Sequence, residues 1–181
     1  MTGCYTSSTR TPLLPITDRT YRWRLHSKHR PSTDRPFDKQ EGNAVQEPNG
    51  TAALIINSAG EYLLHLRDNI DGICDPGTWS LLGGGREGAE TAEAAIAREL
   101  KEEAGLVLPE LKRYTVVSAH VPANTSDQIT IFLGRWDGEA HALPLTEGVM
   151  LHWFPAAMIP RLVMCPWANV VIEQHQRNTA T

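Results

Sequence analysis

The sequence is poor in cysteine and has no long apolar run, and each deficit excludes a class of protein. Its 181 residues include only Cys4, Cys74 and Cys165, an odd number without CxxC spacing. A disulfide framework and a cysteine-based zinc site therefore have no support. No segment reaches the roughly 18 consecutive apolar residues that suggest a membrane-spanning helix. We expect one soluble domain without a membrane partner, in a reducing cytoplasm.

Positive charge is scarce beyond the first 40 residues. Residues 1–40 contain eight Lys or Arg and three Asp or Glu, whereas residues 41–181 contain nine and eighteen, and the net charge is −4. The first segment is also rich in Ser, Thr and Pro and shows little apolar periodicity. We therefore expect a basic, disordered or loosely attached extension over residues 1–48, followed by a folded domain over residues 49–181.

Four roles compete for this extension. The plainest is that the extension has no specific function, which includes the case of a start codon placed too early. A basic arm could meet RNA, because Tyr21 and Trp23 can stack on bases. The arm could instead pack on a second subunit of a homodimer. An acid-poor leader also resembles a transit peptide, although Asp18 and Asp34 count against this, and no apolar segment supports a secretory signal.

The remaining sequence alternates short apolar runs with turn signals, and this order alone predicts an α/β or an α+β domain. Thr91 is expected to cap a helix that continues through Ala104. Pro166 suits the first turn of a closing helix that continues to about Gln176. The expected strands are Thr51–Asn57, Glu61–Arg67, Trp79–Leu82, Arg113–Val121, Gln128–Trp136 and Val149–Phe154.

Three carboxylates project from one face of the first predicted helix. Glu99, Glu102 and Glu103 have the i, i+3 and i+4 spacing that brings side chains together. They lie near the helix end, which Gly105 is expected to set. Negative charge is unfavourable there because the helix dipole is also negative at that end. Like charges at i, i+4 also repel each other. A divalent cation such as Mg²⁺, which prefers oxygen ligands, would relieve both the repulsion and the unfavourable position.

The residues around this cluster distinguish a metal site from a solvated acidic face balanced by Arg98 and Lys101. From Gly84 to Leu106 the sequence fits the pattern G-x5-E-x7-R-E-U-x-E-E-x-G-U at all nine specified positions, where U is a bulky aliphatic residue. This pattern is the Nudix box, and the chain resembles the MutT-like Nudix hydrolases. The resemblance is strong over residues 84–106 and weaker over about residues 51–176.

The resemblance implies an α/β Nudix fold, in which an α/β/α sandwich surrounds a mixed sheet. It also implies an enzyme, a pyrophosphohydrolase that uses Mg²⁺ or Mn²⁺. Such an enzyme cleaves a phosphoanhydride bond in a small nucleotide-type partner, here a nucleoside diphosphate derivative or a nucleoside triphosphate. The metal would neutralise phosphate oxygens and activate water for in-line attack.

Site residues transfer by their positions in the box. Glu99 and Glu103 are implied metal ligands, and Glu102 is either a third ligand or the base that deprotonates water. The backbone carbonyl of Gly83 is expected to complete the metal shell. Arg98 occupies the position from which the family's arginine orients the first glutamate. Glu99, Glu102 and Arg98 are thus the expected catalytic set.

Substrate contacts are expected before the helix. Gly84 and Gly85 allow the backbone to approach a diphosphate closely, because glycine has no Cβ. Trp79 could stack on a base, although core packing is the simpler interpretation. Leu82 replaces the usual proline of the W-x-L-P-G-G lead-in, so the loop is less restrained. Glu147 is a candidate additional ligand or base, with a surface turn as the alternative.

Other residues carry weaker expectations. Glu90 is expected to support the site rather than to react. His152 and Asp127 are minor candidates for an additional ligand or base. Three further aromatic residues could hold a base but fit core packing better: Phe132, Trp136 and Trp153.

Three alternative functions follow from particular features. An RNA 5′-end pyrophosphohydrolase is supported only by the basic extension, so a nucleic-acid partner is left open. A nucleotide-binding sensor that uses the same fold without hydrolysis is disfavoured by the complete box. An isomerase of small diphosphates would need a reactive cysteine, and Cys74 has no motif around it. The loops that select the substrate carry no recognisable signature.

Overall fold

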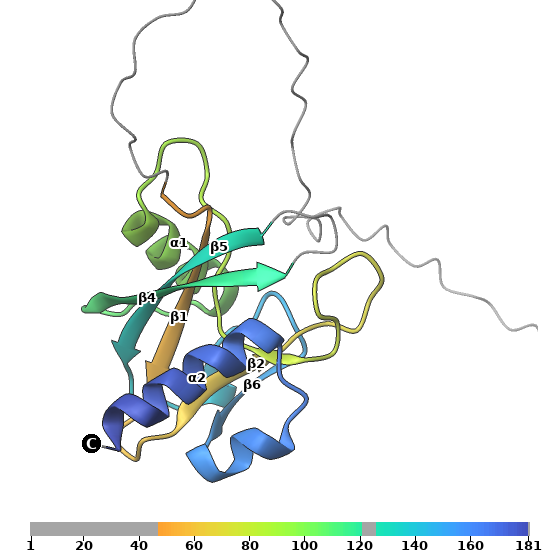
Figure 1. Ribbon diagram of the computed structural model, residues 1–181, viewed down its shortest axis with the longest axis vertical. Coiled ribbons are helices and arrows are strands. Elements are labelled where there is room, and N and C mark those ends of the chain that lie inside the picture. Colours follow the sequence, from red (N-terminus) through yellow and green to blue (C-terminus); the bar gives the residue numbers. More distant parts are fainter. Residues whose placement is uncertain (1–46, 121–125, 181) are drawn as a thin grey trace, which may run out of the picture.

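The computed structural model describes residues 47–120 and 126–180 (Figure 1). Residues 1–46 of the predicted extension, including Cys4, lie outside this description. The strands are β1 Gly50–Ile56, β2 Tyr62–Leu66, β3 Trp79–Ser80, β4 Leu111–His120, β5 Ser126–Arg135 and β6 Met150–Phe154. The helices are α1 Ala92–Ala104 and α2 Pro166–Thr179, with short 3₁₀ turns η1 Ala140–Ala142 and η2 Ala156–Arg161.

The strands form one mixed sheet between two helices. Its order is β3-β2-β1-β5-β4, and β6 pairs with β2. β1 and β5 run parallel, whereas the other strand pairs are antiparallel. Figure 1 shows α2 in front of the sheet and α1 behind it. The predicted α/β/α sandwich around a mixed sheet is therefore confirmed.

Strand β1 supplies both faces of the core. Ala53 and Ile55 pack in the cluster that contains α1, whereas Leu54 and Ile56 pack in the cluster that contains α2. Every residue of β1 is buried. This explains why β1 reads as a continuous apolar run rather than an alternating pattern, because helices cover both sides of the sheet.

Helix α1 begins and ends where the sequence predicts. The Thr91 side chain accepts a hydrogen bond from the Ala94 N–H at 3.2 Å. Gly105 caps the helix and donates its backbone N–H to the carbonyls of Leu100 and Lys101. Leu100 is fully buried, and with Ile96 it fixes the helix against the sheet. The carboxylate-bearing turn is therefore held in place by packing on its apolar side.

Strands β1 and β2 follow each other in the sequence but pair over a short stretch only. Their register has one pair, Ile56 with Tyr62, and β2 then pairs along its length with β6. The segment after β3 occupies the free edge of β1 instead. Ala53 donates its N–H to the Leu82 carbonyl at 2.9 Å, and the Thr51 N–H donates to Gly84 at 2.8 Å. This pairing brings the glycine turn beside the centre of the sheet.

Several boundaries differ from the sequence prediction by one to three residues. The predicted strand Trp79–Leu82 ends at Ser80, because Leu82 makes only an isolated bridge to Ala53. Helix α2 continues three residues beyond Gln176, and its Ala168, Val171 and Ile172 are buried on the sheet. Strand β5 begins at Ser126, two residues before the predicted start at Gln128.

Two of the three cysteines lie in the described part of the chain. Cys74 and Cys165 are free thiols there, one exposed and one buried. The Cys165 thiol donates to Asp75 Oδ2 at 3.1 Å. None of the helices within the described ranges has the length and apolar character of a membrane span.

The Thr91 cap predicts a stability effect. Thr91→Ala removes the acceptor for the Ala94 N–H and should lower the free energy of unfolding by about 1 kcal/mol. Urea denaturation followed by circular dichroism measures this change. Thr91→Ser keeps a hydroxyl acceptor and should remain close to the parent. Equal losses in both variants would contradict the capping role.

Candidate active site

The glycine turn contacts two buried glutamates of α1. A Cβ added to Gly84 would lie 2.4 Å from Glu99 Cδ, so a larger residue there would displace this carboxylate. The Gly83 N–H donates to Glu103 Oε2 at 3.2 Å. Glu99 and Glu103 are only 5% and 8% exposed. The glycines thus allow backbone and carboxylates to share a small volume.

Arg98 joins the carboxylates to the turn. Its guanidinium bonds both oxygens of Glu90, at 2.5 and 3.2 Å, and Glu99 Oε1 at 2.7 Å. It also reaches Glu102 Oε2 at 3.2 Å and donates to the Gly85 carbonyl at 2.9 Å. The hydrogen bonds to Glu90, followed by those to Glu99, raise the pKa of Arg98. This geometry suits the orienting role implied for Arg98.

Glu90 stabilises the entry to α1. Besides pairing with Arg98, its Oε1 accepts the Glu87 N–H at 2.5 Å. Its carbonyl accepts from Arg86 Nε at 2.9 Å. These contacts connect the loop before α1 to the first carboxylate of the box. These contacts suit the supporting role that the resemblance implies for Glu90.

The Glu103 carboxyl group has a raised pKa. Burial raises its pKa to about 8, with further contributions from the negative charges of Glu147 and Glu99. The Gly83 N–H and the positive charge of Arg67 act in the opposite direction. Glu147, 44 positions later in the sequence, is therefore close enough to affect Glu103. The structure brings this predicted loop residue to the carboxylate cluster.

A cleft beside the cluster contains residues that the sequence did not single out. It joins charged side chains from the end of β2, apolar side chains from the following loop, and the loop of Glu147. Apart from Glu147, which the sequence did indicate, the only signal at these positions is a cationic residue at a strand end, and such residues are common on surfaces. The lining consists of His65, Arg67, Asp68, Ile70, Ile73, Glu147 and Gly148.

The carboxylates of the cluster are donors that fit a hard divalent cation, although those in the described residues do not surround a common point. Within residues 47–120 and 126–180, no group of three or more His, Cys, Asp or Glu has converged as a metal site. Glu99 and Glu103 nevertheless offer buried carboxylate oxygens, and burial, followed by repulsion from Glu147 and Glu99, raises the pKa of Glu103. A cation would relieve that repulsion, and oxygen donors are the ligands that Mg²⁺ and Mn²⁺ prefer.

The predicted aromatic contacts mostly serve packing. Trp79 belongs to the cluster on the α2 side of the sheet, where it meets Phe154 edge to face with ring centroids 4.7 Å apart. Phe132 is fully buried, and Trp136 stacks on Trp153. These contacts account for the rings by packing, and Trp79 lies across the sheet from α1.

The minor candidate His152 does not join the cluster. His152 on β6 pairs in register with Leu64 on β2. Its ring contacts that of Phe154, with ring centroids 4.7 Å apart. The side chain of Asp127 is outside the described part of the structure. Glu147 is therefore the one candidate from beyond the box that the described structure places beside Glu103.

Comparisons with known proteins agree with this architecture. A family model described as NUDIX domain matches residues 47–174, so the chain belongs to the NUDIX family. The MutT protein from Methanosarcina mazei Go1 has a similar structure, with a TM-score of 0.65 at 22% identity over 74% of this chain and 96% of that one. The MutT NUDIX hydrolase from Burkholderia pseudomallei gives a TM-score of 0.59 at 25% identity, covering 71% and 98%.

A curated relative matches a shorter segment. The nucleoside triphosphatase NudI of Enterobacter sp. (strain 638) is 47% identical over 51 residues, which make up 28% of this chain. The chain spans 36% of the length of that relative. The family and fold are therefore shown, whereas the activity and substrate must be argued from the site.

The raised pKa of Glu103 predicts a pH dependence of stability. Between its ordinary pKa of 4.5 and the folded value of about 8, the unfolded chain releases this proton and the folded chain keeps it. The free energy of unfolding should therefore fall as pH rises through this window, by up to about 1.4 kcal/mol per pH unit. Urea denaturation with a chelator at several pH values measures the slope.

Glu103→Gln is the matched variant for this measurement, because its amide cannot ionise. Its stability should lack the part of the slope that comes from residue 103. Identical slopes in the parent and the variant would show that Glu103 ionises normally in the folded state.

Proposed function

We propose that this chain is a metal-dependent hydrolase that cleaves a phosphoanhydride bond in a nucleoside triphosphate or a nucleoside diphosphate derivative. One observation carries the proposal: Glu99 and Glu103 are buried against the glycine turn, and Glu147 approaches them from a distant loop. Burying carboxylates without a cation is costly, so a merely structural role gives no reason to gather them.

The proposed ligands come from two parts of the chain. Glu99 and Glu103 hold Mg²⁺ or Mn²⁺, together with the Gly83 carbonyl and either Glu102 or Glu147. When bound, the cation neutralises phosphate oxygens and lowers the pKa of a coordinated water. Since the chain carries a net charge of −4, its overall field does not attract polyanionic substrates.

The protein residues position the reactants. Gly84 and Gly85 leave room for a diphosphate beside the backbone. Arg98 keeps the Glu99 carboxylate in one orientation through its contacts with Glu90 and the turn. Glu102, whose side chain is 46% exposed, or Glu147 accepts the proton of the attacking water at a carboxylate oxygen. Glu103 is better suited to binding than to proton transfer, because it is almost fully buried.

The substrate class is supported by a relative and by the cleft. The matched relative is called a nucleoside triphosphatase, which favours a nucleoside triphosphate here. The cleft beside Glu147 offers apolar Ile70 and Ile73 together with the cation of Arg67. These groups lie beside the carboxylates of Asp68 and Glu147.

Glutamine variants test the proposed activity. The assay offers nucleoside triphosphates and diphosphate derivatives with Mg²⁺ or Mn²⁺ and identifies the products by chromatography. Glu99→Gln and Glu103→Gln should each lower kcat by more than about 100-fold, because an outer-shell partner alone typically accounts for about 10–100-fold. Both variants should keep the native circular dichroism spectrum.

Glu110→Gln is the control for these variants, because Glu110 is an exposed carboxylate shortly after α1. It should retain parental turnover. If the parent cleaved none of the substrates, the hydrolase proposal would be wrong. Parental rates in Glu99→Gln and Glu103→Gln would instead refute the metal-ligand assignment.

The extension gives a separate prediction about nucleic acid. We propose that residues 49–181 form the catalytic domain and that the basic extension is dispensable for free nucleotides. Deleting residues 1–45 keeps Glu47, which pairs with Arg113 on β4. Turnover of free nucleotides should be unchanged. A selective loss of activity on triphosphorylated RNA ends, measured side by side, would favour the RNA alternative.

A further inference from the structure

The segment Thr146–Gly148 is attached to the carboxylate helix at its start. The Thr146 N–H donates to the Glu103 carbonyl at 2.8 Å, and its hydroxyl donates to the Glu102 carbonyl at 2.7 Å. Carbonyls in the last turn of a helix lack partners within the helix, so an outside donor is favourable there. One end of the Glu147 loop is thus fastened directly to α1.

The other end of this segment is attached to the end of β2. The Gly148 N–H donates to Asp68 Oδ2 at 3.2 Å, and the Val149 N–H donates to the Leu66 carbonyl at 2.8 Å. Gly148 has a φ of +86°, and an added Cβ would lie 2.8 Å from the Leu66 oxygen. The chain therefore passes close to β2 in a conformation that favours glycine.

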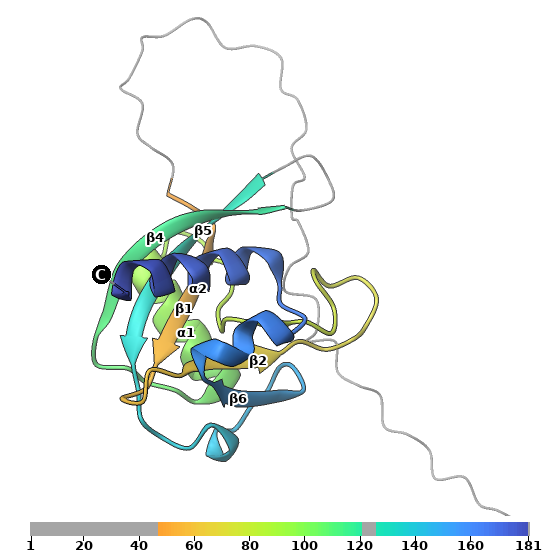
Figure 2. The same cartoon turned by 60° about the horizontal axis from the view of Figure 1, so that its bottom comes forward.

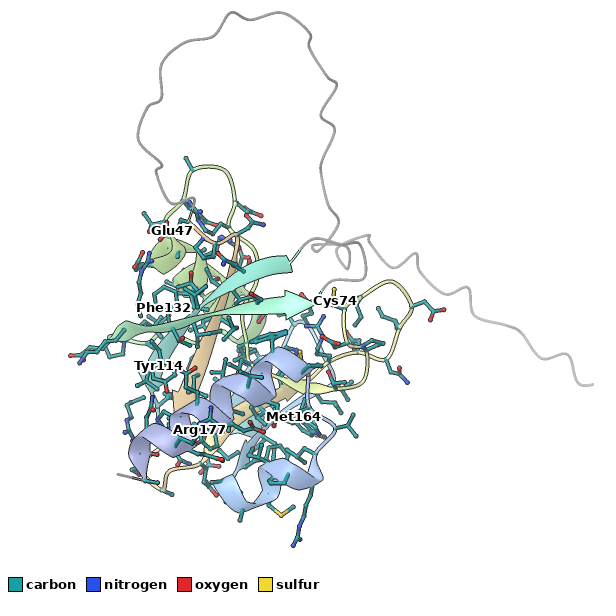
Figure 3. All side chains as sticks on the ribbon, viewed as in Figure 1. Glu47, Cys74, Tyr114, Phe132, Met164 and Arg177 are labelled. Atoms are coloured by element: carbon teal, nitrogen blue, oxygen red, sulfur yellow. The ribbon has the colours of Figure 1, made fainter. Side chains whose placement is uncertain are left out.

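Asp68 also closes the loop that lines the cleft. Its carbonyl accepts the Gly77 N–H at 3.0 Å, at the base of the loop of residues 68–77. This loop projects from the body of the protein, as Figure 2 shows, and Figure 3 labels Cys74 on it. One residue thus uses its backbone to close the cleft loop and its side chain to hold the Glu147 loop.

The two loops face the same cleft. Ile70 and Ile73 come from the loop that Asp68 closes, and Glu147 and Gly148 come from the loop that its carboxylate holds. A substrate group in contact with the isoleucines would therefore press on a segment joined through Asp68 to Glu147. Asp68 thus connects the residues that would contact the substrate with the segment that carries Glu147.

We propose that Asp68 is a positioning residue that holds Glu147 beside Glu103 and links its placement to the loop that lines the cleft. The inference rests on the proposed function, since it assigns Asp68 an effect on turnover through Glu147. A carboxylate that accepts a backbone N–H makes a strong, charge-assisted hydrogen bond. Without it, the glycine-containing loop gains other conformations in which Glu147 leaves the cluster.

A double-mutant cycle tests the connection through kcat of the full chain. Asp68→Ala should lower kcat about tenfold, the lower end of the range for outer-shell partners. In a Glu147→Gln background the same change should alter kcat by less than about twofold, because residues that act as a unit are non-additive. Equal fold losses in both backgrounds would overturn the inference.

Two further variants separate the hydrogen bond from general loop damage. Asp68→Asn keeps an oxygen that can accept from Gly148 and should recover most of the kcat lost in Asp68→Ala. Asp71→Ala removes an exposed carboxylate from the same loop and should match the parent. A loss in Asp71→Ala as large as that in Asp68→Ala would point to loop damage and overturn the assignment.

Amide hydrogen exchange supplies a readout independent of activity. In ¹⁵N-labelled protein without metal or nucleotide, the Gly148 N–H should exchange faster in Asp68→Ala than in the parent or Asp71→Ala. Unchanged exchange would overturn the inference even if kcat fell. A parent that hydrolyses no substrate would refute the proposed function, whereas additive kcat losses in an active enzyme would refute only the role of Asp68.

Discussion

The site depends on the burial of two glutamate side chains against the backbone of a glycine turn. Glu99 and Glu103 lie under the turn with few contacts to water, where an ionised carboxylate is strongly disfavoured unless a partner compensates it. Arg98 compensates Glu99, and the Gly83 N–H partly compensates Glu103. The raised pKa of Glu103 shows that this compensation is incomplete in the protein alone.

The sheet and α1 together meet the geometric demands of this burial. Pairing of Leu82 and Gly84 with β1 fixes the turn on one side, and Leu100 anchors α1 on the other. The turn and the helix are thus attached to the same central strand. Because both supports contact β1, the backbone lies within contact distance of Glu99 without a side chain between them.

The site also depends on hydrogen bonds between α1, the Glu147 loop and the end of β2. Glu147 reaches Glu103 because Thr146 bonds the end of α1 and Gly148 bonds the side chain of Asp68. Each contact uses a backbone group, so its geometry depends on the path of the chain more than on side-chain flexibility. The same segment lines a cleft together with Ile70 and Ile73.

Local sequence was sufficient for α1 and its carboxylates, because helix spacing and capping act within a few residues. Thr91, Gly105 and the order of the glutamates determined where the helix begins, where it ends and which acids share its surface. Tertiary structure decided which supports these acids receive. The parallel pairing of β1 with β5, the position of Trp79 on the α2 side, and the bond between Asp68 and Gly148 join residues far apart in the chain. No local periodicity encodes such contacts, since they arise only when the two helices cover opposite faces of the sheet.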